Sequence, residues 1–223
     1  MATAVLLSGG LDSAVLLADE AARGDVQPIY LGAGLAWEAA ERAVVDRLLA
    51  SDGLRGRTRP MVALSVDMRD VYAATHWAVT GTPPAYHTPD EDVYLPGRNI
   101  VLLAKAGVFC ASAGLNRVVI GTLAHNPFPD ATPEFRSSMA RTLSLGLAHT
   151  LDVEAPYAEI GKAEVIRRGL ALGVPFEFTM SCMKPVEVRH CGECSKCRER
   201  HDAFVEAQVA DPTDYESLKF TGR

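Results

Sequence analysis

The sequence predicts an α/β protein in which a doubly wound, parallel, five-stranded sheet precedes a small C-terminal zinc-binding subdomain. Short apolar runs alternate with amphipathic segments along residues 1–175, which is typical of parallel strands covered by helices on both faces. Four cysteines then crowd residues 176–210, at spacings that close neighbours cannot easily satisfy with disulfides. Residues 211–223 are expected to form a tail whose end frays.

The first strand, expected at residues 5–7, leads into a glycine-rich turn and then a helix. Residues 8–13 read Ser-Gly-Gly-Leu-Asp-Ser, which is neither a Walker A loop nor a dinucleotide-binding turn. Glycines allow close backbone approach, and a helix N-terminus favours negative charge. The hydroxyls of Ser8 and Ser13 can donate to phosphate oxygens, and Asp12 can cap the helix or hold a metal ion. The turn therefore predicts a phosphate site, the alternative being a junction whose glycines serve only the turn.

The other elements follow in chain order. Apolar runs predict strands at residues 27–31, 61–66, 117–122 and 151–155. Apolar positions at helical spacing predict helices at residues 37–50, 98–113, 134–148 and 162–172. Between them, Gly81, Pro83, Pro84 and Pro89 are expected to break any helix in residues 72–94, a long loop typical of a functional lid. Loops that follow parallel strands should converge on one ligand site.

Bulk composition narrows the class of protein. A chain of 223 residues with 48% hydrophobic and 22% charged residues is typical of one globular domain with a small appendage. No apolar run approaches the ~20 residues of a membrane span, and no basic segment precedes the first apolar run. We therefore expect a cytoplasmic protein. The net charge of -6 argues against a broad nucleic-acid-binding surface.

The cysteine cluster predicts a metal site. Its members are Cys182, Cys191, Cys194 and Cys197, a spacing that suits tetrahedral zinc in a closed, structural site. An iron–sulfur cluster, a redox pair and coincidence are the alternatives. His190 and His201 are near enough to replace a ligand, although surface positions are favoured for both. Cys110 stands apart on an apolar helix and is expected to be a buried small hydrophobe.

Three motifs occur in order: Ser-Gly-Gly-Leu-Asp-Ser at 8–13, Pro-Gly-Arg-Asn at 96–99, and the cysteine site. Together they resemble the 7-cyano-7-deazaguanine synthase family, a branch of the PP-loop ATP pyrophosphatases, over residues 2–204. The resemblance implies that ATP adenylates the carboxylate of 7-carboxy-7-deazaguanine and that ammonia displaces AMP to give the amide. A second activation and loss of water give the nitrile. ATP, magnesium and zinc are the implied cofactors.

The resemblance also implies roles for individual residues. Catalysis is assigned to Ser8, Asp12, Ser13, Lys162 and Arg98, where magnesium and the cations would stabilise charge on the α-phosphate. ATP is expected to contact Leu7, Ser8, Gly9, Gly10, Leu11, Asp12, Ser13, Tyr30 and Leu31. The acid substrate is expected to contact Arg98, Asn99, Phe128, Asp130 and Glu134. The alternatives are a capped helix start at Arg98 and Asn99 and a solvated lysine at position 162.

Two segments depart from the family pattern. Residues 31–38 lack the arginine and histidine of a Tyr-Gly-Gln-Arg-His-like stretch, and Ala131 and Thr132 replace a Cys-Arg pair. Both departures fall where the acid should bind, so ATP use is better supported than the identity of the acid. One alternative is an enzyme that joins the activated acid to another amine, including one on a protein. Another is a non-catalytic nucleotide-binding zinc module. The apolar stretch Val101–Val108 is either core or part of a homodimer contact, and free ammonia is the expected nitrogen source.

Overall fold

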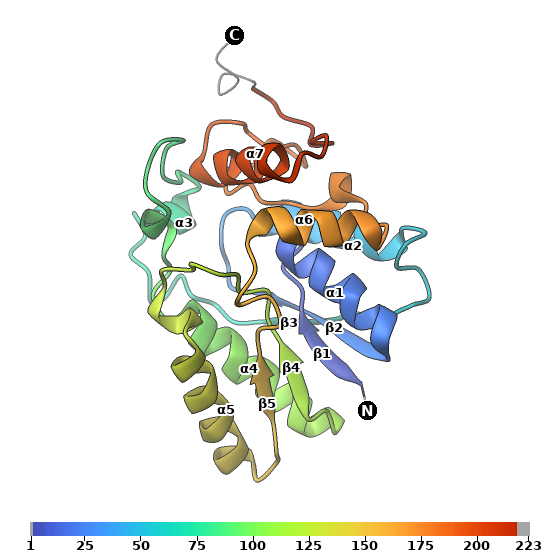
Figure 1. Cartoon of the computed structure of the whole chain (residues 1–223). Helices are drawn as coiled ribbons and strands as arrows, with labels where there is room; N and C mark the ends of the chain where they lie inside the picture. The colour runs from blue at the N-terminus through green and yellow to red at the C-terminus, as the bar shows by residue number, and fades with distance from the viewer. Residues whose placement is uncertain (1, 218–223) are drawn as a thin grey trace.

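The computed structural model describes residues 2–217 and confirms the predicted parallel sheet (Figure 1). Five parallel strands lie in the order β3-β2-β1-β4-β5. Their bounds are Thr3–Leu6 for β1, Val26–Gly32 for β2, Val62–Ser65 for β3, Arg117–Val119 for β4 and Asp152–Glu154 for β5. The chain builds outward from β1 in both directions, so the turn after β1 lies at the switch in strand order, where ligands bind in such sheets.

Helices cover both faces of the sheet (Figure 1). One face carries α1 (Leu11–Arg23), α2 (Glu38–Ala50) and α6 (Lys162–Ala171), and the other carries α4 (Arg98–Ala113) and α5 (Pro133–Leu147). A further helix, α7 (Ser195–Ala207), packs on the outer side of α6 and adds Phe204 to the first core. Cys110 is fully buried in the second core, as expected.

Two expectations about local structure were wrong in detail. Residues 72–94 contain a short helix, α3 (Trp77–Thr80), and a 3-10 turn, η1 (Asp90–Val93), because the prolines lie outside these turns instead of within them. The fourth strand ends at Val119, before residue 122. The chain there passes close to the start of α1, since a Cβ on Gly121 would lie 3.3 Å from the Ser13 nitrogen.

The segment after the sheet folds against α6 and α7. It includes the 3-10 turn η3 (Phe176–Phe178), which leads into the cysteine region. A further 3-10 turn, η2 (Pro129–Ala131), lies earlier, in the loop between β4 and α5. The residues after α7 lie against the cysteine region, where the amide of His190 donates to the Asp214 carbonyl at 3.0 Å. The division into domains stays a prediction, and residues 218–223 of the expected tail lie outside the described residues. No helix within residues 2–217 is long and apolar enough to cross a membrane.

Candidate active site

The turn between β1 and α1 is held open toward the carboxyl end of the sheet. Gly9 has a φ of 76°, in the left-handed region that favours glycine. A Cβ at this position would lie 2.8 Å from Cγ2 of Val45 and 3.2 Å from the carbonyl oxygen of Glu41. Both neighbours belong to α2. Glycine is therefore required here twice over, by the backbone conformation and by the closeness of α2.

Two serines brace this turn. The Ser13 hydroxyl donates to the Gly10 carbonyl at 3.0 Å and lies 3.2 Å from the Ser8 hydroxyl, while the Ser8 amide donates to Ser13 Oγ at 3.2 Å. Gly10 is the N-cap of α1 and offers no side-chain cap. The capping role suggested for Asp12 is therefore wrong, and the first-turn amides of α1 remain free to bind an anion.

Asp12 instead belongs to a chain of half-buried charges. Its Oδ2 lies 3.3 Å from Nζ of Lys162, which also pairs with Glu199 of α7. Glu199 pairs in turn with Lys196. The Lys162 side chain is only 18% exposed, so the alternative of a solvated lysine is wrong. Two acids and two lysines thus connect the phosphate turn to the first turns of α6 and α7.

Burial and pairing compete in setting the pKa values of this network. Burial raises the pKa of Asp12, and the Lys162 ammonium only partly offsets that effect. For Glu199 burial acts in the same sense, but Lys162 and Lys196 outweigh it and lower the pKa to about 2. Burial would lower the pKa of Lys162, yet Asp12 and Glu199 raise it above its ordinary value. Lys162 therefore stays a cation beside the phosphate turn, and Glu199 stays an anion.

A cavity of about 260 Å³ opens next to this turn and brings together most of the predicted site residues. Those in its wall are Ser8, Gly10, Asp12, Ser13, Arg98, Asn99, Phe128 and Asp130. The sequence did not single out Tyr94, Thr122 and Asn126, which line it as well. Residues from β1, α4 and the loop after β4 therefore meet in one chamber, as the strand-end rule predicted.

The wall opposite the phosphate turn is built by α4. The Nε of Arg98 is buried and has no hydrogen-bond partner within residues 2–217, so it can donate to an anionic or polar ligand. Asp130 accepts from the Asn99 amide at 3.2 Å, and the Asn99 side chain donates to the Asp130 carbonyl at 3.0 Å. The helix start is thus capped from outside, by Asp130. Burial raises the pKa of this carboxyl, and Asn99 opposes the shift.

An aromatic pair closes another side of the cavity. Tyr94 and Phe128 are stacked, with ring centroids 5.1 Å apart. Tyr94 ends the long loop, which is anchored on α7: Arg198 donates to the carbonyls of Tyr86 and Thr88 at 2.7 and 3.1 Å. It also pairs with Asp90 at 3.0 Å. The helix that begins in the cysteine region therefore holds the loop that borders the cavity.

Some predicted contacts lie elsewhere. Leu7 and Leu31 line a second, smaller cavity, whereas the buried Tyr30 points its hydroxyl to Glu41 at 3.4 Å. Glu134 is exposed in the first turn of α5 and is not among the residues that line either cavity. Residues 31–38, which differ from the family pattern, form a turn closed by Glu38. Its carboxylate accepts from the amides of Ala33 and Gly34.

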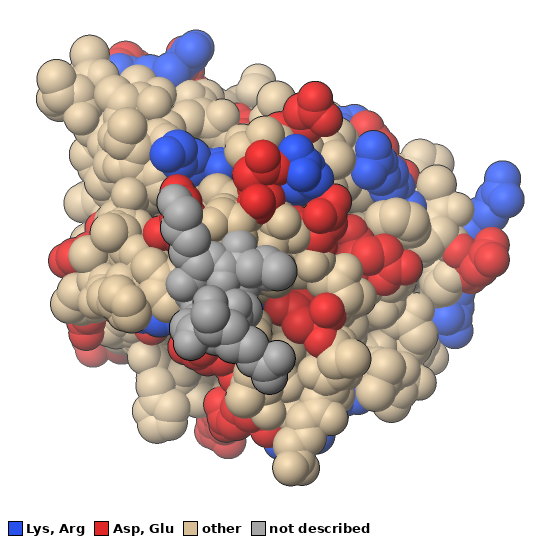
Figure 2. Space-filling view, turned by 90° about the horizontal axis from the view of Figure 1, so that it is seen from above, with Lys and Arg blue, Asp and Glu red and all other residues tan. Residues whose placement is uncertain are grey.

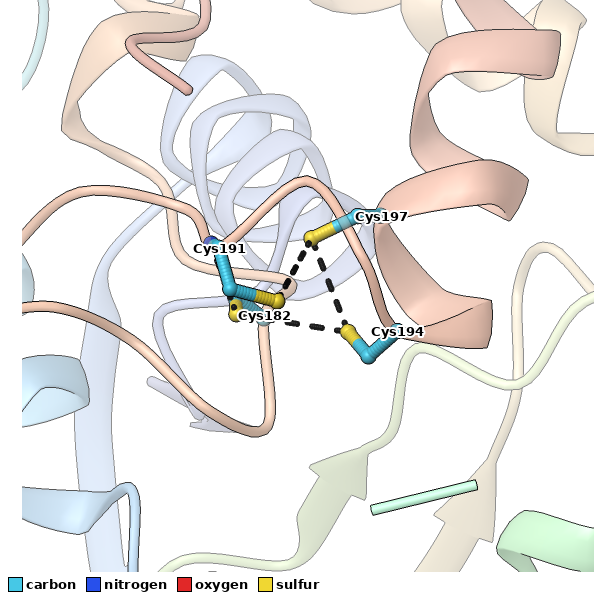
Figure 3. A group of neighbouring side chains, drawn as sticks. All are labelled: Cys182, Cys191, Cys194 and Cys197. Atoms are coloured by element: carbon cyan, nitrogen blue, oxygen red, sulfur yellow. Dashed lines mark hydrogen bonds between the residues drawn. The ribbon is translucent and has the colours of Figure 1, made fainter. Parts of the chain in front are cut away.

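The four predicted cysteines converge, with their sulfur atoms pointing toward one another (Figure 3). The Sγ atoms of Cys191 and Cys197 are 3.9 Å apart, those of Cys182 and Cys194 are 4.0 Å apart, and those of Cys194 and Cys197 are 3.5 Å apart. Sulfur ligands of tetrahedral zinc stand about 3.8 Å from each other, given Zn–S bonds of about 2.3 Å. All four are buried. Donor type, number and spacing fit a closed zinc site.

Neighbouring groups support the sulfur atoms. The amides of Lys184 and Cys191 each donate to Cys182 Sγ at 3.3 Å, which disperses thiolate charge. His190 is buried, and its Nε2 accepts from the Ser181 amide at 3.0 Å. The favoured surface position for His190 was therefore wrong, since this ring braces the segment leading to Cys182. Burial and the nearby Arg200 lower its pKa to about 3, so it is neutral.

Sequence reasoning missed several residues of the site. Glu199, Lys196 and Arg198 lie in or beside the cysteine run, but nothing in their spacing connects them with Lys162 or with the loop at 82–93. Glu41 did leave a signal. It occupies the apolar stripe of α2, four residues after Trp37 and four before Val45, where a charged side chain is out of place.

The parallel sheet, the phosphate turn at its switch point and the four-cysteine knuckle define a PP-loop α/β protein with a metal-binding subdomain. A family model described as "Queuosine biosynthesis protein QueC" matches residues 2–208. The chain belongs to this family.

Curated relatives match nearly the whole chain and carry the name 7-cyano-7-deazaguanine synthase. The relative from Methanoculleus marisnigri is 34% identical, with 95% of this chain and 97% of the relative covered. The one from Thermoplasma acidophilum is 34% identical over 95% and 91%, respectively. A solved structure described as a predicted subunit of tRNA methyltransferase from Methanocaldococcus jannaschii has a TM-score of 0.50 at 14% identity, with 98% of this chain and 94% of that chain covered. That likeness concerns the fold.

Proposed function

We propose that this protein is an ATP-dependent ligase that converts 7-carboxy-7-deazaguanine and ammonia into 7-cyano-7-deazaguanine, with release of AMP and pyrophosphate. The cavity is the observation that carries the proposal, because it brings the phosphate turn, Arg98 and the Tyr94–Phe128 stack into one chamber. Membership of the QueC family and the relatives named 7-cyano-7-deazaguanine synthase support the same reaction.

The residues of the cavity suit the two charged groups of such a reaction, the phosphates of ATP and the carboxylate of the acid. Ser8, Ser13 and the free amides of α1 would bind the β- and γ-phosphates, and Lys162 would stabilise negative charge as pyrophosphate leaves. Arg98 would hold the carboxylate of the acid, and the Tyr94–Phe128 pair would contact its flat ring. A carboxylate is a poor electrophile, and adenylation supplies the leaving group that ammonia then displaces.

The metal requirements follow from the donors present. Oδ1 of Asp12 is buried and no described residue donates a hydrogen bond to it, which fits an oxygen ligand for magnesium. Magnesium, when bound, would neutralise the phosphate oxygens. Zinc at the cysteine site would be structural, because four thiolates leave no position for substrate.

Ammonia as the nitrogen source, a cytoplasmic location and a homodimer remain predictions. On the α7 side of the molecule acidic and basic side chains are interspersed, without a continuous basic stripe (Figure 2).

The decisive experiment measures AMP and pyrophosphate release with ATP, magnesium, 7-carboxy-7-deazaguanine and ammonium, together with the mass of the base product. We expect release that depends on the acid, and a nitrile product. A matched pair of variants tests the site. Lys162→Met should abolish most of the activity, whereas Arg167→Met, on the exposed side of the same helix, should keep it. Release with the acid but with an amine other than ammonia as acceptor would contradict the proposal, as would no release at all.

A further inference from the structure

A second cavity borders the first, and its wall includes a buried carboxyl group that the proposed mechanism has not used. Its volume is about 40 Å³. Leu6, Ser8, Arg98 and Leu102 line both cavities, so the two are separated only by shared side chains. The remaining wall consists of Leu7, Ile29, Leu31 and Glu41. Apolar side chains thus surround three polar ones, those of Ser8, Glu41 and Arg98.

Glu41 is the most enclosed of the polar groups. Glu41 is 8% exposed, and its carboxyl group accepts from Trp37 Nε1 at 3.1 Å and from the Tyr30 hydroxyl at 3.4 Å. These two bonds leave acceptor capacity on both oxygens. Burial raises the pKa of Glu41 to about 7, with Arg98 opposing the shift and Glu38 adding to it. A carboxyl group with such a pKa exchanges a proton readily near neutral pH.

Arg98 supplies the complementary feature. Its buried Nε has no hydrogen-bond partner among the described residues, and the same side chain lines the cavity. A buried donor without a partner indicates an acceptor at the boundary of the two cavities: the carboxylate proposed above, or neutral ammonia, since ammonium has no lone pair with which to accept. One water needs about 10–15 Å³ of such space, so the cavity has room for very few molecules of that size and none for a purine base.

We propose that this small cavity receives the ammonia used in the reaction, with Glu41 as the residue that binds it. The inference rests on the proposed function and names the nitrogen site of the same chamber. Ammonium transfers a proton to the Glu41 carboxylate, and the lone pair of the resulting ammonia forms the C–N bond to the carbonyl carbon of the acyl adenylate. The C–O bond to AMP breaks, its electron pair leaves with AMP, and a proton from the new C–N nitrogen passes to water. Because Ser8 and Arg98 border both cavities, ammonia is released next to the activated carbonyl.

Two half-reactions separate this role from others. Exchange of labelled pyrophosphate into ATP, with the acid and without ammonium, reports adenylation alone. The KM for ammonium in the full reaction reports the amination. Glu41→Gln keeps the size of the side chain and one oxygen that can accept from Trp37, but it removes the carboxylate. We expect exchange within about twofold of the wild type and a KM for ammonium at least tenfold higher.

Hydroxylamine provides a second readout, because it is already a neutral nucleophile at pH 7. The Glu41→Gln variant should form the hydroxamate at close to the wild-type rate, a rescue that a purely structural role would not give. Asp46→Asn is the matched control, since Asp46 is an exposed acid of the same helix. If Glu41→Gln does not fold, Glu41→Asp retains the carboxyl group further from the cavity and should give an intermediate KM for ammonium.

Three results would overturn the inference. An unchanged KM for ammonium in the variants would remove Glu41 from the nitrogen site. A rise confined to the KM for ATP would assign the cavity to the nucleotide, and an equal loss of exchange and amination would make Glu41 a support for Arg98. In each of these cases the proposed function is still supported if the wild-type protein exchanges pyrophosphate into ATP only when the acid is present. Absence of this exchange would refute that function, and the inference with it.

Discussion

Nζ of Lys162 lies 3.3 Å from Oδ2 of Asp12, so the first turns of α6 and α1 are joined at the phosphate turn. Glu199 pairs with Lys162 from the other side and belongs to α7, the helix that starts inside the cysteine knuckle. The four-cysteine region therefore does more than close the fold. Its helix supplies a carboxylate that pairs with the lysine beside the phosphate turn.

The first prediction concerns this pair of contacts. Removing the cation in Lys162→Met should lower kcat/KM about 100-fold or more, as losing one preorganised charge at a transition state does. Glu199→Gln leaves the lysine in place but loosens it, and we expect a loss of about tenfold. Steady-state kinetics with varied ATP check both values. A Glu199→Gln variant with wild-type kinetics would mean that Asp12 alone orients Lys162.

The second prediction concerns the metal. Purified protein should contain one zinc per chain, and Cys194→Ser should lose it and unfold at a clearly lower temperature, because the knuckle, α7 and residues 211–216 share their contacts. Metal analysis and thermal unfolding are the measurements. Cys110→Ser, at a buried cysteine away from the cluster, is the control that should keep the zinc. Iron in place of zinc, or full stability without metal, would contradict the structural role.

The third prediction concerns the anchored loop. Arg198→Ala removes the two bonds to Tyr86 and Thr88 and the pair with Asp90, so residues 82–93 should become open to proteolysis. The KM for the acid should rise several-fold, while the KM for ATP and the zinc content stay unchanged, because Tyr94 borders the cavity at the end of this loop. Arg189→Ala, at an exposed arginine of the cysteine region, serves as control. Equal changes in both KM values would show that Arg198 acts on the whole fold.

These three cases show what the sequence could predict. The strands, the phosphate turn and the cysteine ligands are local patterns, with residues close in the chain or at a fixed period, and the structure reproduces them. Lys162 and Glu199 are 37 positions apart, and Arg198 is more than a hundred positions from Tyr86. Contacts of that kind depend on how α7 packs on α6 and on the path of the loop at residues 82–93. Neither can be predicted from the periodicity of the sequence. Glu41 was open to prediction, since a charge on an apolar helix face always needs an explanation.

The last prediction uses the pKa of Glu41, which burial raises from an ordinary value of 4.5 to about 7. Between these two pH values the folded protein binds the proton and the unfolded chain does not, so the free energy of unfolding falls as pH rises through this window. The loss amounts to about 3 kcal/mol once the pH exceeds 7. Glu41→Gln cannot lose a proton, so the titration at position 41, with the contributions of Glu38 and Arg98 to it, is present only in the wild type and appears in the difference. Between pH 5 and pH 8, urea unfolding should therefore show the variant gaining about 2.5 kcal/mol relative to the wild type, since part of the window lies below pH 5. A difference that stays constant between these two pH values would mean that the buried carboxyl group titrates at its ordinary pKa, and the proton transfer proposed for ammonium would lose its physical basis.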